Sequence, residues 1–243
     1  MAIAVENAVG GNYTNSTSSH TVDWSAGFTP TAGNTLLLTL HVGPNTTRPA
    51  SPPTGWAELE GGADGAPFGN VSYYKENVSS SDTSATINGW SNGGQTGRWS
   101  VIEFSGVPLS GAWGPSAKGV EASGGTTVSA GPTADLSQGT GLSIGVFVVD
   151  NGANMDGAWS SGTWTTITTQ NRTTSGGHTV ARRDLSGTSG ISATYSGYTS
   201  DQSWIAVAAL YDDAAPSGAP TISDLKAASI TATTVQGTYD YAF

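Results

Sequence analysis

The run from Gly141 to Gly145 reads Gly-Leu-Ser-Ile-Gly, and Gly-x-Ser-x-Gly is the pattern in which many hydrolases present a nucleophilic serine. That chemistry needs a strand, a sharp turn that exposes the serine, and a helix after it. Here Ser143 opens an apolar run that continues to Val149, so the sequence predicts a serine inside a strand. We therefore infer no hydrolase triad from this pattern.

Glutamates are the next candidates, because glycosidases hold two carboxylates on either side of the bond that they cleave. Glu58 and Glu60 are two residues apart, which predicts that they share one face of a strand, whereas Glu103 stands alone in another strand. The chain lacks the Glu-x-Asp-x-x-Glu strand of glucanases built on lectin-like sandwiches. We expect Glu58 and Glu60 on a solvated strand face and assign no catalytic residue.

Metal-ligating side chains are few and scattered. The three histidines, His20, His41 and His178, are far apart in the sequence, and the chain has no cysteine. His41 and His178 fall in expected strands, where an outward polar position is commoner than a ligand. Oxygen-bearing side chains between Asp150 and Asp156 could hold calcium, but the segment lacks the spacing of an EF-hand loop, and its Asn-Gly predicts a hairpin turn. We expect no metal and no cofactor.

Four aromatic side chains lie beside glycine and asparagine in expected loops, where an amphipathic ring can stack on a sugar or contact a partner. They are Trp90, Trp113, Trp159 and Tyr198. Packing within the loops is the simpler interpretation, and glycan or partner contact is the functional alternative.

The elements that position these side chains come in two matched sets, because the chain repeats itself at an offset of 108 in the numbering. The best stretch, Ser84-Ala-Thr-Ile-Asn-Gly-Trp90, is answered by Ser192-Ala-Thr-Tyr-Ser-Gly-Tyr198. Other residues match at the same offset: Thr35 with Ser143, Leu36 with Ile144 and Trp56 with Trp164. A repeat of this length is a whole array of strands that has been copied.

A further tryptophan match, Trp99 with Trp204, has an offset of 105, so the second copy has lost about three residues before its last strand. A residue type that both copies keep is most simply explained by a shared core position. We therefore expect this pair, together with Trp56 and Trp164, in the core.

The strand candidates are short β-rich runs bounded by turn formers. The first set comprises 21–25, 35–42, 56–60, 71–77, 84–88 and 98–104, and the second comprises 126–130, 142–149, 164–169, 178–184, 191–195 and 203–211. The 34 glycines and a charged fraction of only 11% also favour strands and tight turns over helices. The sequence thus predicts an all-β, antiparallel, jelly-roll-like β-sandwich of about 12 strands.

We expect one duplicated β-sandwich domain over 1–213, with repeats at about 20–107 and 126–212. A single set of strands would leave an apolar face uncovered, so we predict two packed sheets that each draw strands from both repeats. Two separate domains joined at 108–125 are the alternative.

A linker rich in proline, alanine and glycine is expected at 214–220, and 221–243 is too short to own a core. This C-terminal β segment would be a partial immunoglobulin-like or fibronectin-like module, or a tail that docks on a partner. Strand addition to a neighbouring subunit, most simply in a trimer, would cover it. The candidate contact residues are Ile222, Leu225, Ile230, Val235, Tyr239, Tyr241 and Phe243.

The charge and hydropathy of the chain exclude several classes of partner. A formal charge of -10 with eight Lys and Arg residues works against binding of nucleic acid, whose phosphates attract cations. No apolar run approaches the ~20 residues that span a bilayer, so no membrane partner is expected. The segment from Met1 to Asn7 lacks the basic and apolar regions of a signal peptide.

Four segments occur in an order that resembles the β-sandwich structural proteins of tailed-phage virions, of the decoration, tail and fibre type. They are Ala32-Gly-Asn-Thr-Leu-Leu-Leu38, Pro53-Thr-Gly-Trp56, Tyr73-Tyr-Lys75 and Trp99-Ser-Val-Ile-Glu-Phe-Ser-Gly-Val107. The resemblance covers roughly 20–211, and such proteins are often followed by immunoglobulin-like modules.

The resemblance implies a non-enzymatic capsid decoration or tail-associated protein that binds major capsid or tail subunits and forms a homo-oligomer. Its location would be the virion, assembled in the host cytoplasm, which agrees with the expected lack of a signal peptide. A carbohydrate-binding or adhesion module that recognises a host surface glycan is the alternative, and a polysaccharide-degrading enzyme is a third hypothesis.

Overall fold

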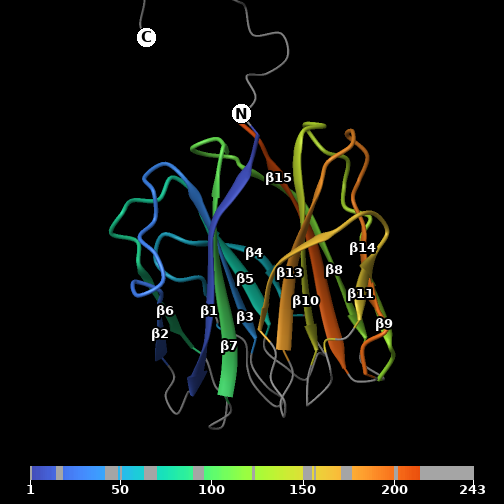
Figure 1. Cartoon of the computed structure of the whole chain (residues 1–243), viewed down its shortest axis with the longest axis horizontal. Helices are drawn as coiled ribbons and strands as arrows, with labels where there is room; N and C mark the ends of the chain where they lie inside the picture. The colour runs from blue at the N-terminus through green and yellow to red at the C-terminus, as the bar shows by residue number, and fades with distance from the viewer. Residues whose placement is uncertain are drawn as a thin grey trace, which may run out of the picture. The chain divides into compact units, whose positions relative to one another are not determined.

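The computed structural model describes residues 2–14, 19–41, 49, 51–62, 70–89, 96–121, 124–149, 155, 157–170, 177–199 and 202–213. These residues form fifteen strands in antiparallel sheets and no helix, which confirms the predicted all-β class (Figure 1). The jelly-roll-like designation stays a prediction. Residues up to Asp213 form one compact unit, and the linker at 214–220 and the segment 221–243, with its seven candidate contact residues, lie outside the described residues.

The first half of this unit forms a five-stranded sheet in the order β1-β7-β3-β5-β4 and a two-stranded sheet, β2-β6. Alternating apolar residues and β-branched runs produce these strands, and glycine-rich or polar segments separate them. Their bounds are Ala4–Thr14 (β1), Ser19–Asp23 (β2), Thr35–His41 (β3), Ala57–Gly61 (β4), Val71–Lys75 (β5), Ser84–Asn88 (β6) and Thr96–Ser105 (β7).

The second half forms a five-stranded sheet in the order β12-β13-β10-β15-β8 and a three-stranded sheet in the order β11-β14-β9. The bounds are Trp113–Glu121 (β8), Thr127–Ala130 (β9), Gly141–Val149 (β10), Ala158–Ser160 (β11), Thr165–Gln170 (β12), Gly177–Asp184 (β13), Ala193–Ser196 (β14) and Ser203–Tyr211 (β15). Three strands were not predicted, β1, β8 and β11, and β8 occupies much of the expected join at 108–125.

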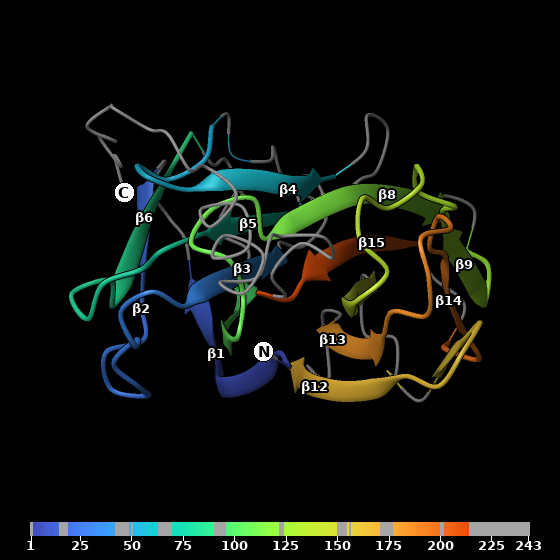
Figure 2. The ribbon, with the colours of Figure 1, turned by 90° about the horizontal axis from the view of Figure 1, so that it is seen from above.

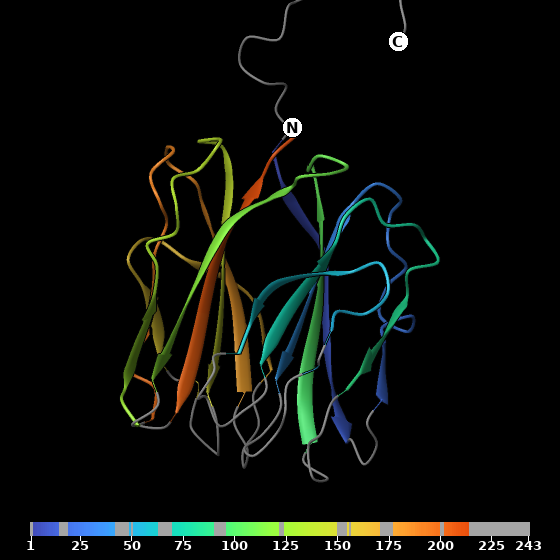
Figure 3. The ribbon, with the colours of Figure 1, turned by 180° about the vertical axis from the view of Figure 1, so that it is seen from behind.

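No sheet of the described residues draws strands from both halves, so the prediction of mixed sheets is wrong. The two halves occupy separate sides of the unit in both side views (Figures 1 and 3). The view from above shows four layers, with the two large sheets facing each other between the small sheets (Figure 2). Each copy therefore covers one face of its large sheet with its own small sheet, and the other face with the other copy.

Three apolar clusters fill the spaces between the four layers. An outer cluster in the first half includes Leu36 and Leu38, and an outer cluster in the second half includes Phe147. The third cluster joins the halves through residues such as Leu37 and Ile144. The central strands β3, β10 and β15 are consequently buried on both faces, as their nearly continuous apolar sequences require.

The large sheets correspond strand by strand when the order of the second sheet is reversed. The matching strands are then β1 and β8, β7 and β15, β3 and β10, β5 and β13, and β4 and β12. A β-bulge between Glu58 and Glu60 in β4 has its counterpart between Thr166 and Thr168 in β12, at an offset of 108. In these strands the structural offset therefore equals the offset that the sequence predicts.

The central strands correspond at a different offset. Leu36 of β3 pairs with Lys75, and Ser143 of β10 pairs with Arg183. Lys75 and Arg183 match at the offset of 108. Leu36 thus corresponds to Ser143, at an offset of 107, and not to Ile144. The predicted matches in this strand are wrong by one residue, and because side chains alternate along a strand, a slip of one changes the face.

The same slip affects the tryptophans of the last strand of each copy. Trp99 lies in the outer cluster of the first half, whereas Trp204 lies in the cluster between the halves. Both are buried, as predicted, but they do not share a core position. Trp56 and Trp164 are partly buried and pack against the outer clusters of their own halves.

Candidate functional site

Ser143 lies inside β10, as predicted, and not on a turn. The residues on either side, Leu142 and Ile144, belong to the cluster between the halves, so Ser143 faces the opposite way, toward the small sheet of the second half. Its side chain is 1% exposed, and its Oγ has no hydrogen-bond partner among the described residues.

Glu58 and Glu60 do not share a face. The bulge between them pairs Glu58 with Tyr73 and Glu60 with Ser72, and neighbouring residues of β5 point to opposite faces. Glu60 is half-buried and accepts a hydrogen bond of 2.8 Å from Ser116 Oγ of β8. The expectation of a shared, solvated face is therefore wrong, and Glu60 links the edge strands of the two large sheets.

Glu103 of β7 is fully buried and accepts three hydrogen bonds. Asn7 Nδ2 donates to one carboxylate oxygen at 2.6 Å, and Asn34 Nδ2 and the backbone N–H of Thr31 donate to the other, both at 2.7 Å. The carboxylate thus joins β1, β7 and the segment before β3. A carboxylate held in this way is a structural acceptor with no access for a substrate.

His178 of β13 is fully buried between the halves, and His41 of β3 is 1% exposed, so the expected outward positions are wrong. The Nε2 atom of His178 lies 2.7 Å from Ser100 Oγ and 3.3 Å from Thr39 Oγ1, both in the first half. Burial, with smaller contributions from His41 and Arg98, lowers the pKa of His178 to about 3. This neutral imidazole is a polar connection between two apolar sheets.

The described residues contain no group of three or more His, Cys, Asp or Glu side chains that could hold a metal ion. His20 lies in β2 and pairs with Ile87 of β6. Of the segment considered for calcium, Asp150 to Asn154 and Asp156 lie outside the described residues.

The four aromatics that were predicted in loops have different environments. Trp113 begins β8 and Trp159 lies in β11, so the loop prediction is wrong for these two. Tyr198 is 2% exposed and packs against Phe147 in the outer cluster, so it is not a surface contact. Trp113 packs on Phe104, with ring centres 6.3 Å apart, and is partly buried between the halves. Trp90 lies outside the described residues.

Trp159 stacks on Trp164 with ring centres 5.1 Å apart, and both rings are partly buried on the second half. They lie over Gly145, where a Cβ atom would collide with both rings. The second glycine of the Gly-x-Ser-x-Gly pattern is thus explained by a close approach of side chains. The serine two residues before it on the same face lies at the edge of a cavity.

This cavity is an open pocket of about 550 Å³ in the second half. The large sheet lines it with Ser143, Thr165 and the last three residues of β13, 182–184. The remaining lining comes from 162–163, before β12, and from 185–187 and 189–191, after β13. Most other lining side chains are hydroxyls or glycines, including Thr163, Ser189 and Gly190. The pocket is therefore polar, with a buried serine that has no hydrogen-bond partner in the described part of the chain.

The charged residues of the lining are Arg182, Arg183 and Asp184, and of these Arg183 shares the face of Ser143, with which it pairs. Its guanidinium lies 4.8 Å from the centre of the Trp164 ring and donates hydrogen bonds to the carbonyl oxygens of Ser161 and, at 3.1 Å, Ser192. Burial lowers the pKa of Arg183, but a guanidinium stays protonated at neutral pH. Within the described residues these partners include no carboxylate, so the positive charge has no counter-ion there.

The backbone at the rim of the pocket is strained. Ser161 has a φ of 68° and Gly162 a φ of 129°, and a Cβ atom at Gly162 would collide with the Arg183 guanidinium. A left-handed serine whose carbonyl oxygen accepts from the arginine holds the guanidinium in place. The arrangement can bind an anionic or hydroxyl-bearing group.

No protein-family model matches the chain, and no curated protein and no solved structure matches it significantly. The part of the chain that the structure describes contains no helix that could span a bilayer.

Sequence reasoning missed the pocket, and Arg183 and Trp164 were not proposed as binding residues. The repeat contained a signal for it. At the offset of 108, Lys75 matches Arg183, another cation, whereas Asp82 matches Gly190, which has no carboxylate. Residues that both copies keep indicate the core, whereas residues that differ indicate what one copy does alone.

Proposed function

We propose that this chain is a non-enzymatic structural protein of a tailed-phage virion, a capsid decoration or tail-associated subunit that binds other virion proteins. The observation that carries the proposal is that the titratable side chains considered for chemistry make hydrogen bonds within the fold. Glu60, Glu103 and His178 each contact other strands. A general acid or base must reach a substrate, so this use favours an architectural role.

The layered architecture supports the same role. Both faces of each large sheet are covered, and the sheets meet through a third apolar cluster, so the described unit is one compact body. Such a body suits a protein that adds to a particle surface, with partner contacts on its edges and loops. The proposed partners are major capsid or tail subunits and further copies of the chain.

The test is whether the chain belongs to the particle. Particles produced from the genome that encodes the chain are purified by density gradient, and their proteins are quantified by peptide mass spectrometry and located by cryo-electron microscopy. We expect tens or more copies per particle and density that fits the four-layered unit. A chain that is expressed but absent from intact particles would contradict the proposal.

A second candidate function, carbohydrate binding in host recognition, is favoured by the pocket beside Trp164 and Arg183. Hydroxyl groups and arginines, which line this pocket, are side chains with which proteins bind sugars and acidic groups. The test is binding of the whole chain to a panel of bacterial surface polysaccharides. Binding that persists after substitution of pocket residues would contradict this role of the pocket.

A further inference from the structure

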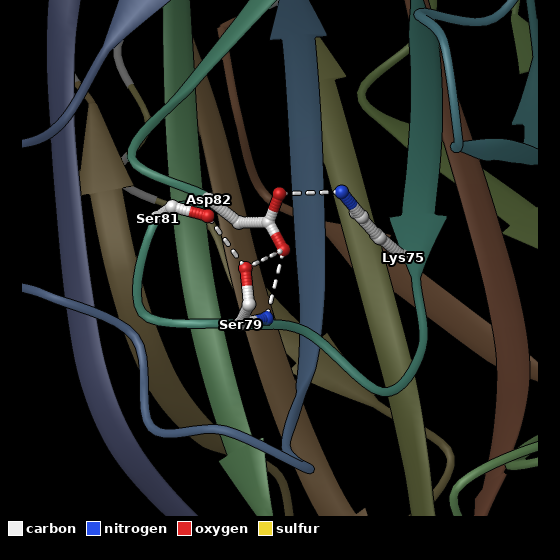
Figure 4. Close-up of polar contacts among 4 residues, drawn as sticks. All are labelled: Lys75, Ser79, Ser81 and Asp82. Carbon is white, nitrogen blue, oxygen red and sulfur yellow. Dashed lines mark hydrogen bonds and ion pairs between the residues drawn. The ribbon is translucent and has the colours of Figure 1, made fainter.

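The first half contains an ion pair at the place that corresponds to the pocket of the second half. Lys75 Nζ lies 2.5 Å from Asp82 Oδ1, and the other oxygen of Asp82 accepts hydrogen bonds from the backbone N–H of Ser79 at 2.8 Å and from Ser79 Oγ at 3.1 Å (Figure 4). Burial disfavours the charge of Asp82, but Lys75 and Ser79 outweigh it and lower the pKa of the carboxyl. The cation and carboxylate neutralise each other inside this half.

Arg183 is the counterpart of Lys75. The shared bulge equates Tyr73, which pairs with Glu58, and Ala181, which pairs with Thr166. Two residues further along the same face of each strand lie Lys75 and Arg183, and both are at the 108 offset. The cation is therefore kept in both halves.

Gly190 is the counterpart of Asp82. The carbonyl oxygen of Thr83 accepts from the backbone N–H of Trp24, and that of Ile191 accepts in the same way from Thr133, so Thr83 and Ile191 correspond. The residue before each of them is Asp82 in the first half and Gly190 in the second. The second half thus keeps the cation and has no side chain at the position of Asp82. Asp135 Oδ1 accepts a hydrogen bond of 3.3 Å from the backbone N–H of Gly190, but Asp135 does not line the pocket.

Two features keep the place of the missing carboxylate open. A Cβ atom at Gly190 would collide with the carbonyl oxygen of Thr133, so this position accepts no side chain. Ser143, on the large sheet beneath the pocket, takes the place of the larger Leu36 of the first half. The Oγ atom of Ser143 has no hydrogen-bond partner within the described residues. Gly190, Ser143 and Arg183 all line the pocket.

We propose that the pocket of the second half binds an acidic sugar, whose carboxylate occupies the place that Asp82 fills in the first half and pairs with Arg183. The inference deepens the second candidate function. It stands apart from the virion role, which is tested on particles and not with soluble ligands.

The lining favours a sugar over a simple acid. The hydroxyl-bearing residues Thr163, Ser186 and Ser189 line the pocket with Arg183, and their hydroxyl groups can hydrogen-bond to those of a sugar ring. A volume of about 550 Å³ exceeds what one carboxylate needs and lies in the range of pockets for small molecules. The carboxylate that the described lining does contain, Asp184, is next to Arg183 in β13 and faces the other side of the sheet.

The experiment is a titration of the whole chain with sodium glucuronate, followed by NMR chemical shifts, with glucose and N-acetylglutamate as comparison probes. We expect glucuronate to bind at least about tenfold more tightly than either, because only glucuronate offers both the carboxylate and the ring hydroxyls. Equal binding of N-acetylglutamate would overturn the proposal in favour of a protein carboxylate, and no binding of glucuronate would overturn it outright.

Variants locate the binding. Arg183→Met should weaken glucuronate binding about tenfold or more, whereas Lys75→Met, which removes the same charge at the corresponding place in the first half, should leave it unchanged. Equal effects of the two variants would overturn the proposal, because they would indicate attraction by net charge alone.

A third variant controls for the possibility that Arg183→Met weakens binding by disturbing the local fold. Ser189 is exposed on the lining, and Ser189→Asp places a carboxylate in the pocket without removing a contact of Arg183. The introduced carboxylate should compete with glucuronate and weaken binding, and a matched Ser189→Asn should not. If Ser189→Asp binds glucuronate as well as the unchanged chain does, the pocket is not the site.

Discussion

The two halves share one arrangement of strands, yet they treat their polar residues differently. In the first half Glu103 is satisfied by three donors, and Lys75 is paired with Asp82. In the second half Ser143 has no hydrogen-bond partner among the described residues, and Arg183 has no carboxylate there. At corresponding places, the first half thus pairs its cation with a carboxylate, whereas the second half keeps the cation without a carboxylate partner among the described residues.

This difference shows which substitutions a duplicated β fold tolerates. Both halves keep their bulge, their sheet order and a large apolar area, because each large sheet must be covered on two faces. Single side chains nevertheless differ within the central strands, as Leu36 and Ser143 do, and at the connections that follow the strands, as Asp82 and Gly190 do.

Replacing Leu36 in the first half and Ser143, its counterpart in the second half, should have effects of opposite sign on the free energy of unfolding. Leu36→Ser removes a fully buried side chain and leaves a hydroxyl in the outer cluster, so it should lower the free energy of unfolding by about 3–5 kcal/mol. Ser143→Ala removes a buried hydroxyl without a described partner and should raise it by up to about 1 kcal/mol. Urea denaturation measures both, and equal losses in both variants would refute the contrast.

The carboxylate of Glu103 should contribute stability that the second half does not have. The residue that corresponds to it in β15 is Ala209, at an offset of 106. Glu103→Ala leaves three donors without their acceptor and should cost about 3 kcal/mol, whereas Glu103→Gln, which keeps one acceptor, should cost less. Thermal unfolding that is the same for both variants would contradict this account.

His178 should make the contact between the halves sensitive to acid. Its pKa is about 3 when folded and near 6.5 when unfolded, so below pH 6.5 the unfolded chain binds more protons than the folded chain. The contribution of neutral His178 to the free energy of unfolding is fully present above pH 6.5. It decreases by about 1.4 kcal/mol per pH unit as the pH falls toward 3.

The matched variant is His178→Asn, because Asn70 occupies the corresponding place in the first half, at the offset of 108. It keeps a hydrogen-bonding side chain and does not titrate. Urea denaturation of both proteins at pH 7, 5.5 and 4.5 should give a shallower pH dependence for the variant, and parallel curves would show that His178 does not carry the effect.

The ion pair of the first half should have the smallest effect. Asp82→Asn removes the charge that faces Lys75, and because both side chains are partly exposed, the loss should be below about 1 kcal/mol and should shrink in high salt. A loss of several kcal/mol would mean that the carboxylate has a larger structural role than its exposure indicates. The measurement is the urea midpoint at low and high ionic strength.

Much of the local structure could be predicted from the sequence. Composition indicated an all-β chain, turn formers bounded most of the strands, and the repeat located corresponding strands at an offset of 108 in β4, β5 and β6. These features depend on nearest neighbours and on the period of two along a strand, which a sequence displays directly. Ser143 was placed correctly inside a strand for the same reason.

The predicted site residues were less informative, because burial depends on what covers a strand. His178 and Glu103 look like ordinary polar residues of strands, and only the stacking of four layers makes them buried groups with specific partners. The pocket depends on three segments that are far apart in the sequence around Ser143, Gly162 and Gly190. No local pattern joins them.

Alternation and turn chemistry are local properties, so twelve of the fifteen strands and their duplication could be predicted from the sequence, whereas β1, β8 and β11 could not. Which strands share a sheet, and which face of each strand looks outward, depends on packing between segments that are far apart in the chain. A single bulge, or a change of the offset from 108 to 107, reverses every side chain of a strand, so Leu36 corresponds to Ser143 and Trp99 faces a different cluster from Trp204. A pocket with an unneutralised arginine follows from that register and not from any motif.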